Sequence, residues 1–196
     1  MRIGFHVKKT GLTGDKKFET IGDAIRSEVK ERQITAAQIF THGPQFFKKN
    51  KIIPADFKDI SATDLTVHCC YPSAGFWKDP EDEKKDKQLY DMIEQANVCK
   101  DIHAWGAVIH IYNKDHLQIK KRCNLLKDHY KKQGVVLLLE MSAGKSSETT
   151  YDRPERINLL VDTLYDGTRW FGITVDTAHI WGAGQNIRSY DDMKKW

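Results

Sequence analysis

Five side chains that could bind a divalent metal each follow a short apolar run of the sequence. They are His68, His110, Glu140, Asp176 and His179. Imidazoles and carboxylates without a cysteine are the ligand set of a catalytic zinc or a related site. A carboxylate between two imidazole sites can bridge two metals, and two metals about 3.5–4 Å apart suit phosphoester hydrolysis. If the fold brings these five residues together, the sequence predicts a hydrolytic metal centre.

The segments that must position these residues alternate between strand-like and helix-like patterns. The strand-like runs are 2–7, 36–40, 65–68, 107–110, 135–139 and 170–175, and the helix-like stretches are 20–32, 81–100, 114–132, 153–164 and a last one from Ser189. Val135–Leu139 is apolar throughout, which is typical of a parallel strand buried on both faces. The strands begin roughly 30 to 40 residues apart, the size of a βα unit. This order predicts an α/β fold with a parallel sheet, either a doubly wound open sheet or most of a (β/α)8 barrel.

Parallel strands place all their carboxyl ends at one edge, where sites in α/β proteins are built. We expect His68 to lead into a loop containing Pro72–Gly75, and Asp176 to lead from its strand into another loop. His6 lies inside the first strand and points either into a barrel or towards its helices. No complete nucleotide-phosphate fingerprint is present, and Ala143–Ser146 has only the tail of one, so we predict no nucleotide cofactor.

Composition and charge narrow the class of protein. With 196 residues, 40% hydrophobic and 30% charged, the chain is typical of one soluble globular domain. The net charge of +4 is compatible with a polyanionic partner, although most lysine pairs are expected on solvated helix faces. The four cysteines form no Cys-x-x-Cys pair, and Cys99 and Cys123 are expected in the core. No run reaches the roughly 20 apolar residues of a membrane span, and the N-terminus is no signal peptide, so we expect an intracellular protein.

Several stretches resemble the endonuclease IV family of apurinic/apyrimidinic endonucleases. Gly172–His179 is similar to the family signature Gly-Leu-Cys-Ile-Asp-Thr-Cys-His, and Ile3–Val7 resembles the family opening Ile-Gly-Ala-His-Val. The pairs Phe40-Thr41, Val67-His68 and Ile109-His110 and the run Leu138–Glu140 follow in the family order. Ile180–Tyr190 is most similar to divergent members carried by large DNA viruses. The resemblance covers essentially the whole chain.

The resemblance implies a TIM-type (β/α)8 barrel with three zinc ions, represented here by one domain over residues 1–196 with about six βα units. His68, His110 and Glu140 would hold the first zinc. Glu140 would bridge to the second zinc, which Asp176 also binds, and His179 would bind the third. Glu140 is therefore the residue expected to act in catalysis.

The resemblance also implies the substrate and the reaction. Family members cleave the backbone of double-stranded DNA 5′ to an abasic site, and they remove blocking groups from 3′ ends. Tyr71 matches a tyrosine that enters the DNA helix, whereas Gln45 stands where the family has a DNA-probing arginine. Thr174 and Ala178 replace the two cysteines of the signature. We expect a monomer without membrane contacts, located in the cytoplasm, the nucleus or a virion.

The family continues for two more βα units, which supply further ligands to the second and third zinc ions. We therefore expect an incomplete barrel in which only the first zinc site is complete. Two other functions stay open. One is a sugar isomerase or epimerase, in which two carboxylates and a histidine at one Mn²⁺, Mg²⁺ or Co²⁺ move a proton on a ketose. The other is an inactive remnant that binds DNA.

Overall fold

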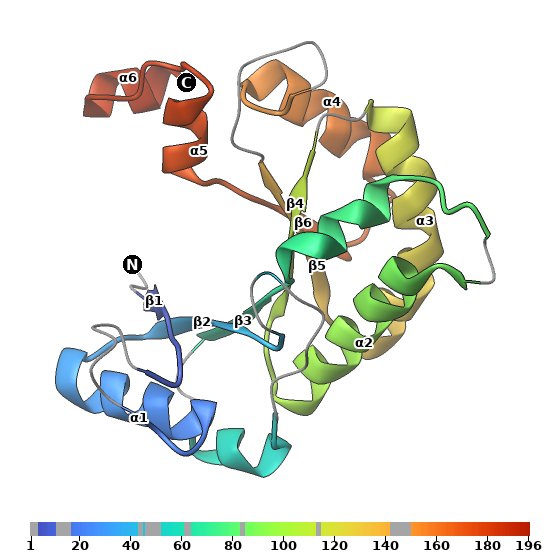
Figure 1. Cartoon of the computed structure of the whole chain (residues 1–196). Helices are drawn as coiled ribbons and strands as arrows, with labels where there is room; N and C mark the ends of the chain where they lie inside the picture. The colour runs from blue at the N-terminus through green and yellow to red at the C-terminus, as the bar shows by residue number, and fades with distance from the viewer. Residues whose placement is uncertain are drawn as a thin grey trace.

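The computed structural model describes residues 4–10, 17–42, 45, 52–60, 64–82, 85–112, 115–141 and 150–196. Its centre is one parallel sheet (Figure 1) of β1 (Gly4–His6), β2 (Ala36–Phe40), β3 (Asp64–His68), β4 (Gly106–Ile111), β5 (Val136–Met141) and β6 (Phe171–Thr174). The helices are α1 (Ile21–Arg32), α2 (Lys87–Asp101), α3 (His116–Gln133), α4 (Pro154–Leu164), α5 (Thr177–Gly182) and α6 (Tyr190–Lys195), with 3₁₀ helices η1 (Pro54–Ile60) and η2 (Tyr71–Trp77).

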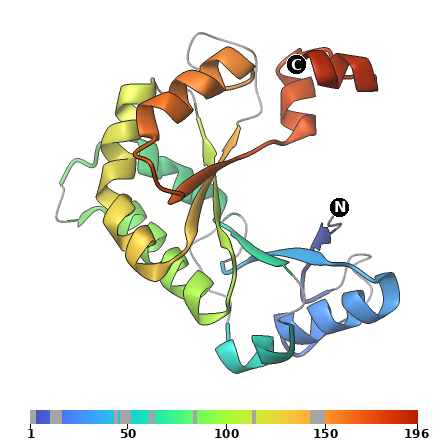
Figure 2. The same cartoon turned by 180° about the vertical axis from the view of Figure 1, so that it is seen from behind.

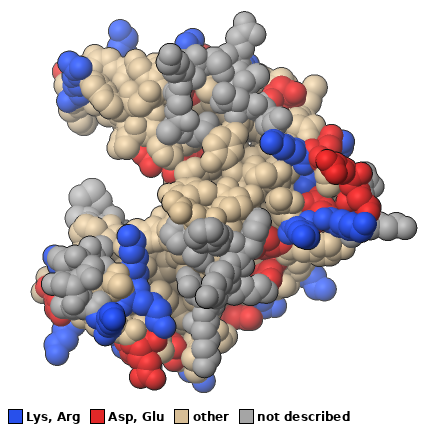
Figure 3. All heavy atoms as spheres, in the orientation of Figure 1, with Lys and Arg blue, Asp and Glu red and all other residues tan. Residues whose placement is uncertain are grey.

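The strand order decides between the two predicted architectures. The strands lie side by side in sequence order from β1 to β6, and each neighbouring pair is parallel. A doubly wound sheet reverses its strand order at a switch point, whereas a (β/α)8 barrel adds each strand beside the previous one. The sheet is therefore of the barrel type. Helices α2, α3 and α4 cover one side of the sheet (Figure 2), and the opposite side is its concave face. The space-filling view shows a hollow between an upper and a lower part of the molecule (Figure 3).

The parallel register lines up several polar residues of neighbouring strands. His6 pairs with Gln38 and Gln38 with Thr66, while His110 pairs with Glu140 and Glu140 with Thr174. Because strand side chains alternate between faces, even-numbered residues share the concave face. The odd-numbered residues face the helices, and most are buried and apolar: Ala37, Ile39, Leu65, Val67, Ala107, Ile109, Leu137 and Leu139. His6 is thus assigned to the concave face, which resolves the choice left by the sequence.

Helix α3 shows how local sequence sets the elements around the sheet. The Asp115 carboxylate accepts hydrogen bonds from the backbone amides of Leu117 and Gln118, and Gly134 ends the helix with a left-handed φ of 69°. Its buried face repeats at helical spacing and contains Ile119, Cys123, Leu126 and Tyr130. Cys99 is likewise fully buried on α2, so the predicted core positions of both cysteines are confirmed.

Three local predictions were wrong. The helix expected from Glu81 begins at Lys87, because the buried Asp86 carboxylate accepts from the Leu89 amide and pairs with Arg122. The segment expected as a loop around Pro72–Gly75 is η2, and Asp176 begins helix α5 instead of a loop. The short Ala143–Ser146 motif lies outside the described residues. In the described part of the chain, no helix has the length and apolar character of a membrane span.

Candidate metal centre

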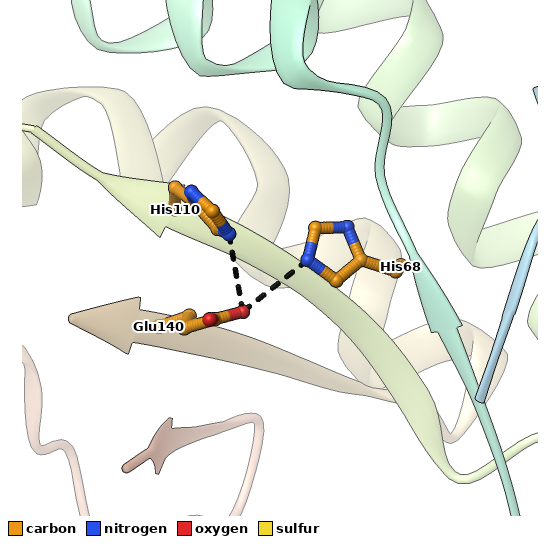
Figure 4. Close-up of side chains that lie close together, drawn as sticks. All are labelled: His68, His110 and Glu140. Atoms are coloured by element: carbon orange, nitrogen blue, oxygen red, sulfur yellow. Dashed lines mark ion pairs between the residues drawn. The ribbon is translucent and has the colours of Figure 1, made fainter. Parts of the chain in front are cut away.

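Three strand ends bring His68, His110 and Glu140 together (Figure 4). The Nε2 atoms of His68 and His110 each lie 3.3 Å from the same carboxylate oxygen, Oε2 of Glu140. The β4–β5 register places His110 beside Glu140, and the His68 and His110 rings are 5.1 Å apart between centroids. The side chains of the three residues are 9%, 13% and 7% exposed. We call these three residues the inner group.

The second ring nitrogen of His68 fixes which way the imidazole faces. Its Nδ1 lies 2.6 Å from the backbone carbonyl oxygen of Cys69, which can only accept a hydrogen bond, so Nδ1 carries the proton. Nε2 on the other side of the ring is thereby turned towards the Glu140 carboxylate, 3.3 Å from Oε2. Metal-binding histidines commonly donate their other ring N–H in this way. The inner group therefore fits a divalent cation.

Glu140 supplies the negative charge of the centre. Burial raises the pKa of its carboxyl group, but hydrogen bonds from His110 and His68 outweigh burial and lower the pKa to about 2. The side chain is consequently an anion near neutral pH. An anionic carboxylate beside two imidazoles is a donor set that zinc accepts.

A second group forms around the other oxygen of Glu140. His179 Nδ1 lies 3.5 Å from Glu140 Oε1, and His179 Nε2 lies 3.6 Å from Asp176 Oδ2. Asp176 Oδ1 accepts hydrogen bonds from the amides of Ala178 and His179 at the start of α5. We call Glu140, Asp176 and His179 the outer group. The two oxygens of Glu140 therefore face different groups, Oε2 towards His68 and His110 and Oε1 towards His179.

The structure also locates the other residues singled out by the sequence. Tyr71 is 46% exposed, and its ring centroid lies 6.1 Å from that of His68 and 5.6 Å from that of His110. Gln45 is exposed, but the residues on both sides of it lie outside the described part. His6 packs on Phe40 at 4.4 Å between ring centroids, and burial, followed by the nearby His68, lowers its pKa to about 4.

A buried polar cluster behind η2 was missed by the sequence analysis. It consists of Thr41, His42, Ser73, Asp91 and Gln95, and we call it the Asp91 network. Ser73 donates to Asp91 Oδ2 at 2.6 Å, and His42 Nε2 lies 3.5 Å from Asp91 Oδ1. Gln95 Nε2 lies 2.8 Å from His42 Nδ1, and Thr41 donates to Gln95 Oε1. The network ties the segments after β2 and β3 to α2. Asp91 and Gln95 stand four residues apart on an otherwise apolar helix face. This pair of polar residues was the feature of the sequence that could have indicated the network.

Further contacts hold η2 beside the inner group. The Trp77 indole donates to the backbone carbonyl of His110 at 2.7 Å, and the Arg122 guanidinium donates to the carbonyl of Phe76. Arg122 also lies over the Phe76 ring, 4.4 Å from its centroid. The segment that begins with Tyr71 is thus bonded to β4, α2 and α3.

Comparisons with known proteins indicate the family of the chain. The profile of the xylose isomerase-like TIM barrel family matches residues 27–195. A Natranaerobius thermophilus protein named probable endonuclease 4 is 25% identical over 99% of this chain and 68% of its own length. A protein of African swine fever virus (isolate Tick/Malawi/Lil 20-1/1983) named probable AP endonuclease is 30% identical over 82% of this chain and 54% of its own length. The chain thus spans about half to two thirds of these relatives.

Solved structures share the fold. The crystal structure of AsfvAP:AG superposes with a TM-score of 0.76 and 23% identity, covering 90% of this chain and 60% of that one. A D-tagatose 3-epimerase-like protein also matches, so likenesses at this level of identity show the fold alone. The profile match and the curated relatives together confirm the resemblance drawn from the sequence: the chain belongs to the xylose isomerase-like TIM barrel family, among relatives named for endonuclease IV and AP endonuclease.

Proposed function

We propose that this chain is a single TIM-barrel domain of a zinc-dependent endonuclease that hydrolyses DNA 5′ to an abasic site. Removal of blocking groups from 3′ ends would be a related activity of the same centre. The observation that carries the proposal is the sharing of Glu140, whose Oε2 faces His68 and His110 while its Oε1 faces His179. This arrangement supports zinc ligands in the inner group and a second metal position in the outer group.

Each residue has a separate task in the proposed reaction. Zinc, when bound, supplies a Lewis acid for the phosphoryl oxygens and stabilises the charge that develops during cleavage. Glu140 stays anionic, as its lowered pKa requires, so it balances and orients cationic charge and does not donate a proton. The Nδ1 bonds of His68 and His179 to backbone carbonyls hold both rings in place before substrate arrives.

The proposed partner is double-stranded DNA containing an abasic site. The centre lies on the concave side of the sheet, which a nucleotide extruded from the duplex could enter. Tyr71 exposes its ring beside His68 and His110, and we propose that it contacts the DNA next to the lesion. Gln45 is proposed as a second, polar contact. The names of the relatives support the substrate class.

The test measures metal and cleavage on the same preparations. Native mass spectrometry should find zinc in the wild-type chain and a loss of zinc in His110→Ala. The control variant His116→Ala changes a histidine at the start of α3 and should keep the metal. A duplex with one synthetic abasic site should be nicked 5′ to the lesion by the wild type and the control only. A wild-type chain without metal under zinc-replete conditions contradicts the proposal.

Two further assay outcomes distinguish the other functions. Zinc and DNA binding without nicking would indicate a non-catalytic DNA-binding protein. Isomerisation or epimerisation of a ketose, with no action on abasic DNA, would indicate a sugar enzyme of the same fold. The imidazoles of His68, His110 and His179 favour zinc over the oxygen-rich sites that Mn²⁺ and Mg²⁺ prefer.

A further inference from the structure

A second exposed tyrosine lies beside the candidate metal centre. Tyr112 follows β4 directly, and its ring centroid is 6.3 Å from that of His110 with an interplanar angle of 56°. The corresponding values for Tyr71 and His110 are 5.6 Å and 59°. The two tyrosine side chains are 44% and 46% exposed. Two neighbouring strand ends thus present similar aromatic rings around the same imidazole.

We propose that Tyr112 is a stacking surface that binds an unstacked nucleobase next to the extruded sugar. The inference rests on the proposed function, because it assigns a base-binding site to the proposed endonuclease. Neither the sequence pattern nor the resemblance singled out Tyr112. Both singled out His110, which stands two positions before it.

The exposure of Tyr112 separates it from tyrosines that serve the core. Tyr130 is fully buried, and its hydroxyl donates to the backbone carbonyl of Met92. Tyr112 instead leaves nearly half of a large apolar side chain in contact with solvent beside a buried polar centre. An exposed aromatic ring beside buried polar groups is suited to a ligand that has both an apolar face and a charged group. A nucleotide combines a base with a phosphate in this way.

The chemistry of the ring limits which part of the DNA it can bind. Bases inside a duplex are stacked on each other and offer no free face. Extrusion of an abasic sugar interrupts that stack and exposes the face of an adjacent base. Aromatic side chains bind such faces with little preference for sequence, and loss of one ring weakens binding by roughly 5- to 150-fold. A stacking contact adds no charge, so it should change affinity without changing its dependence on salt.

The test compares Tyr112→Ala with Tyr112→Phe, which keeps the ring and removes only the hydroxyl. The control Tyr165→Ala removes a ring that is 64% exposed at the end of α4. Fluorescence anisotropy would measure the dissociation constant of the full chain for a duplex with one non-cleavable abasic analogue, at several salt concentrations. Zinc content and thermal unfolding would be measured on the same samples.

The expected result is a loss of affinity of about 5- to 50-fold in Tyr112→Ala, within the range of single stacking contacts. Tyr112→Phe and Tyr165→Ala should bind within about twofold of the wild type, since the first keeps the aromatic ring at position 112 and the second does not change Tyr112. Zinc content and the slope of affinity against salt should be unchanged in all variants.

Three outcomes would overturn the inference while leaving the proposed function intact. They are wild-type affinity in Tyr112→Ala, an equal loss in Tyr112→Phe, and a loss of zinc in Tyr112→Ala, which would mean that the ring supports His110 instead of contacting DNA. A wild-type chain that holds zinc but binds no abasic duplex would overturn both proposals.

Discussion

The two groups that share Glu140 are built in different ways. The inner group takes its side chains from the ends of three adjacent strands, and all three are at least 87% buried, as His68, His110 and Glu140 are 9%, 13% and 7% exposed. The outer group depends on α5, a helix of six residues, and its His179 and Asp176 side chains are 19% and 34% exposed. Asp176 also divides its two oxygens between capping the helix and facing His179. We infer that the inner group is fixed by the sheet, whereas the outer group is fixed mainly by the start of one short helix.

The surroundings of the inner group are also more extensively bonded than those of the outer group. Behind the inner group, the Asp91 network and the Trp77–His110 bond connect β2, η2, β4 and α2 through buried contacts. For the outer group, the bond between His179 and the Met141 carbonyl joins α5 to β5. Buried, fully bonded polar groups define one geometry, because an unmade bond in a low dielectric is costly. The inner group should therefore bind metal more tightly than the outer group does.

The largest expected effect comes from Glu140→Gln, because this residue belongs to both groups. The amide keeps the shape of the side chain but removes the negative charge that lies beside His68 and His110. We expect metal affinity to fall by roughly 100-fold or more, beyond the 10- to 100-fold typical of residues that only support a ligand. Competition with a chromophoric chelator would measure it. Wild-type affinity in this variant would show that Glu140 is not a ligand.

The next effect should separate the two groups. His110→Ala removes an inner ligand, whereas His179→Ala removes an outer one. In a zinc titration the first variant should lose the tighter binding step and the second should lose only the weaker step, since burial and rigidity favour the inner position. Equal losses from the two variants would contradict the difference between the groups.

The sequence predicted more of the inner group than of its surroundings. His68, His110 and Glu140 were found because each is the first strongly polar residue after an apolar run, and parallel strands align their ends. The strand order was also predictable, because about six βα units in succession leave few topologies. The Asp91 network was not, since contacts between His42 and Asp91 depend on how α2 packs and not on spacing along the chain. Tyr112 was missed for a similar reason: an exposed tyrosine carries no signal until its neighbours in space are known.

The Asp91 network gives the third prediction. In Asp91→Asn, the new amide N–H must face either Ser73, which donates to Asp91 Oδ2, or His42, whose Nε2 lies 3.5 Å from Asp91 Oδ1. A buried donor without an acceptor costs about 1–3 kcal/mol, so the free energy of unfolding should fall by that amount. Urea unfolding of the metal-free chain would measure the change. The matched control is Asp101→Asn at the exposed end of α2, which should stay within about 0.5 kcal/mol of the wild type.

The smallest expected effect on stability concerns Asp176, which caps α5 and also faces His179. Separating these two roles is the finest test of the outer group. Asparagine caps helices as well as aspartate does, so Asp176→Asn should change the stability of the metal-free chain by no more than a few tenths of a kcal/mol, whereas Asp176→Ala should cost about 1 kcal/mol. Both variants lose the carboxylate oxygen that faces His179, so both should weaken the second zinc step equally. Urea unfolding and zinc titration on the same samples would separate capping from metal binding. If Asp176→Asn kept the second step at wild-type affinity, Asp176 would serve only as the cap of α5.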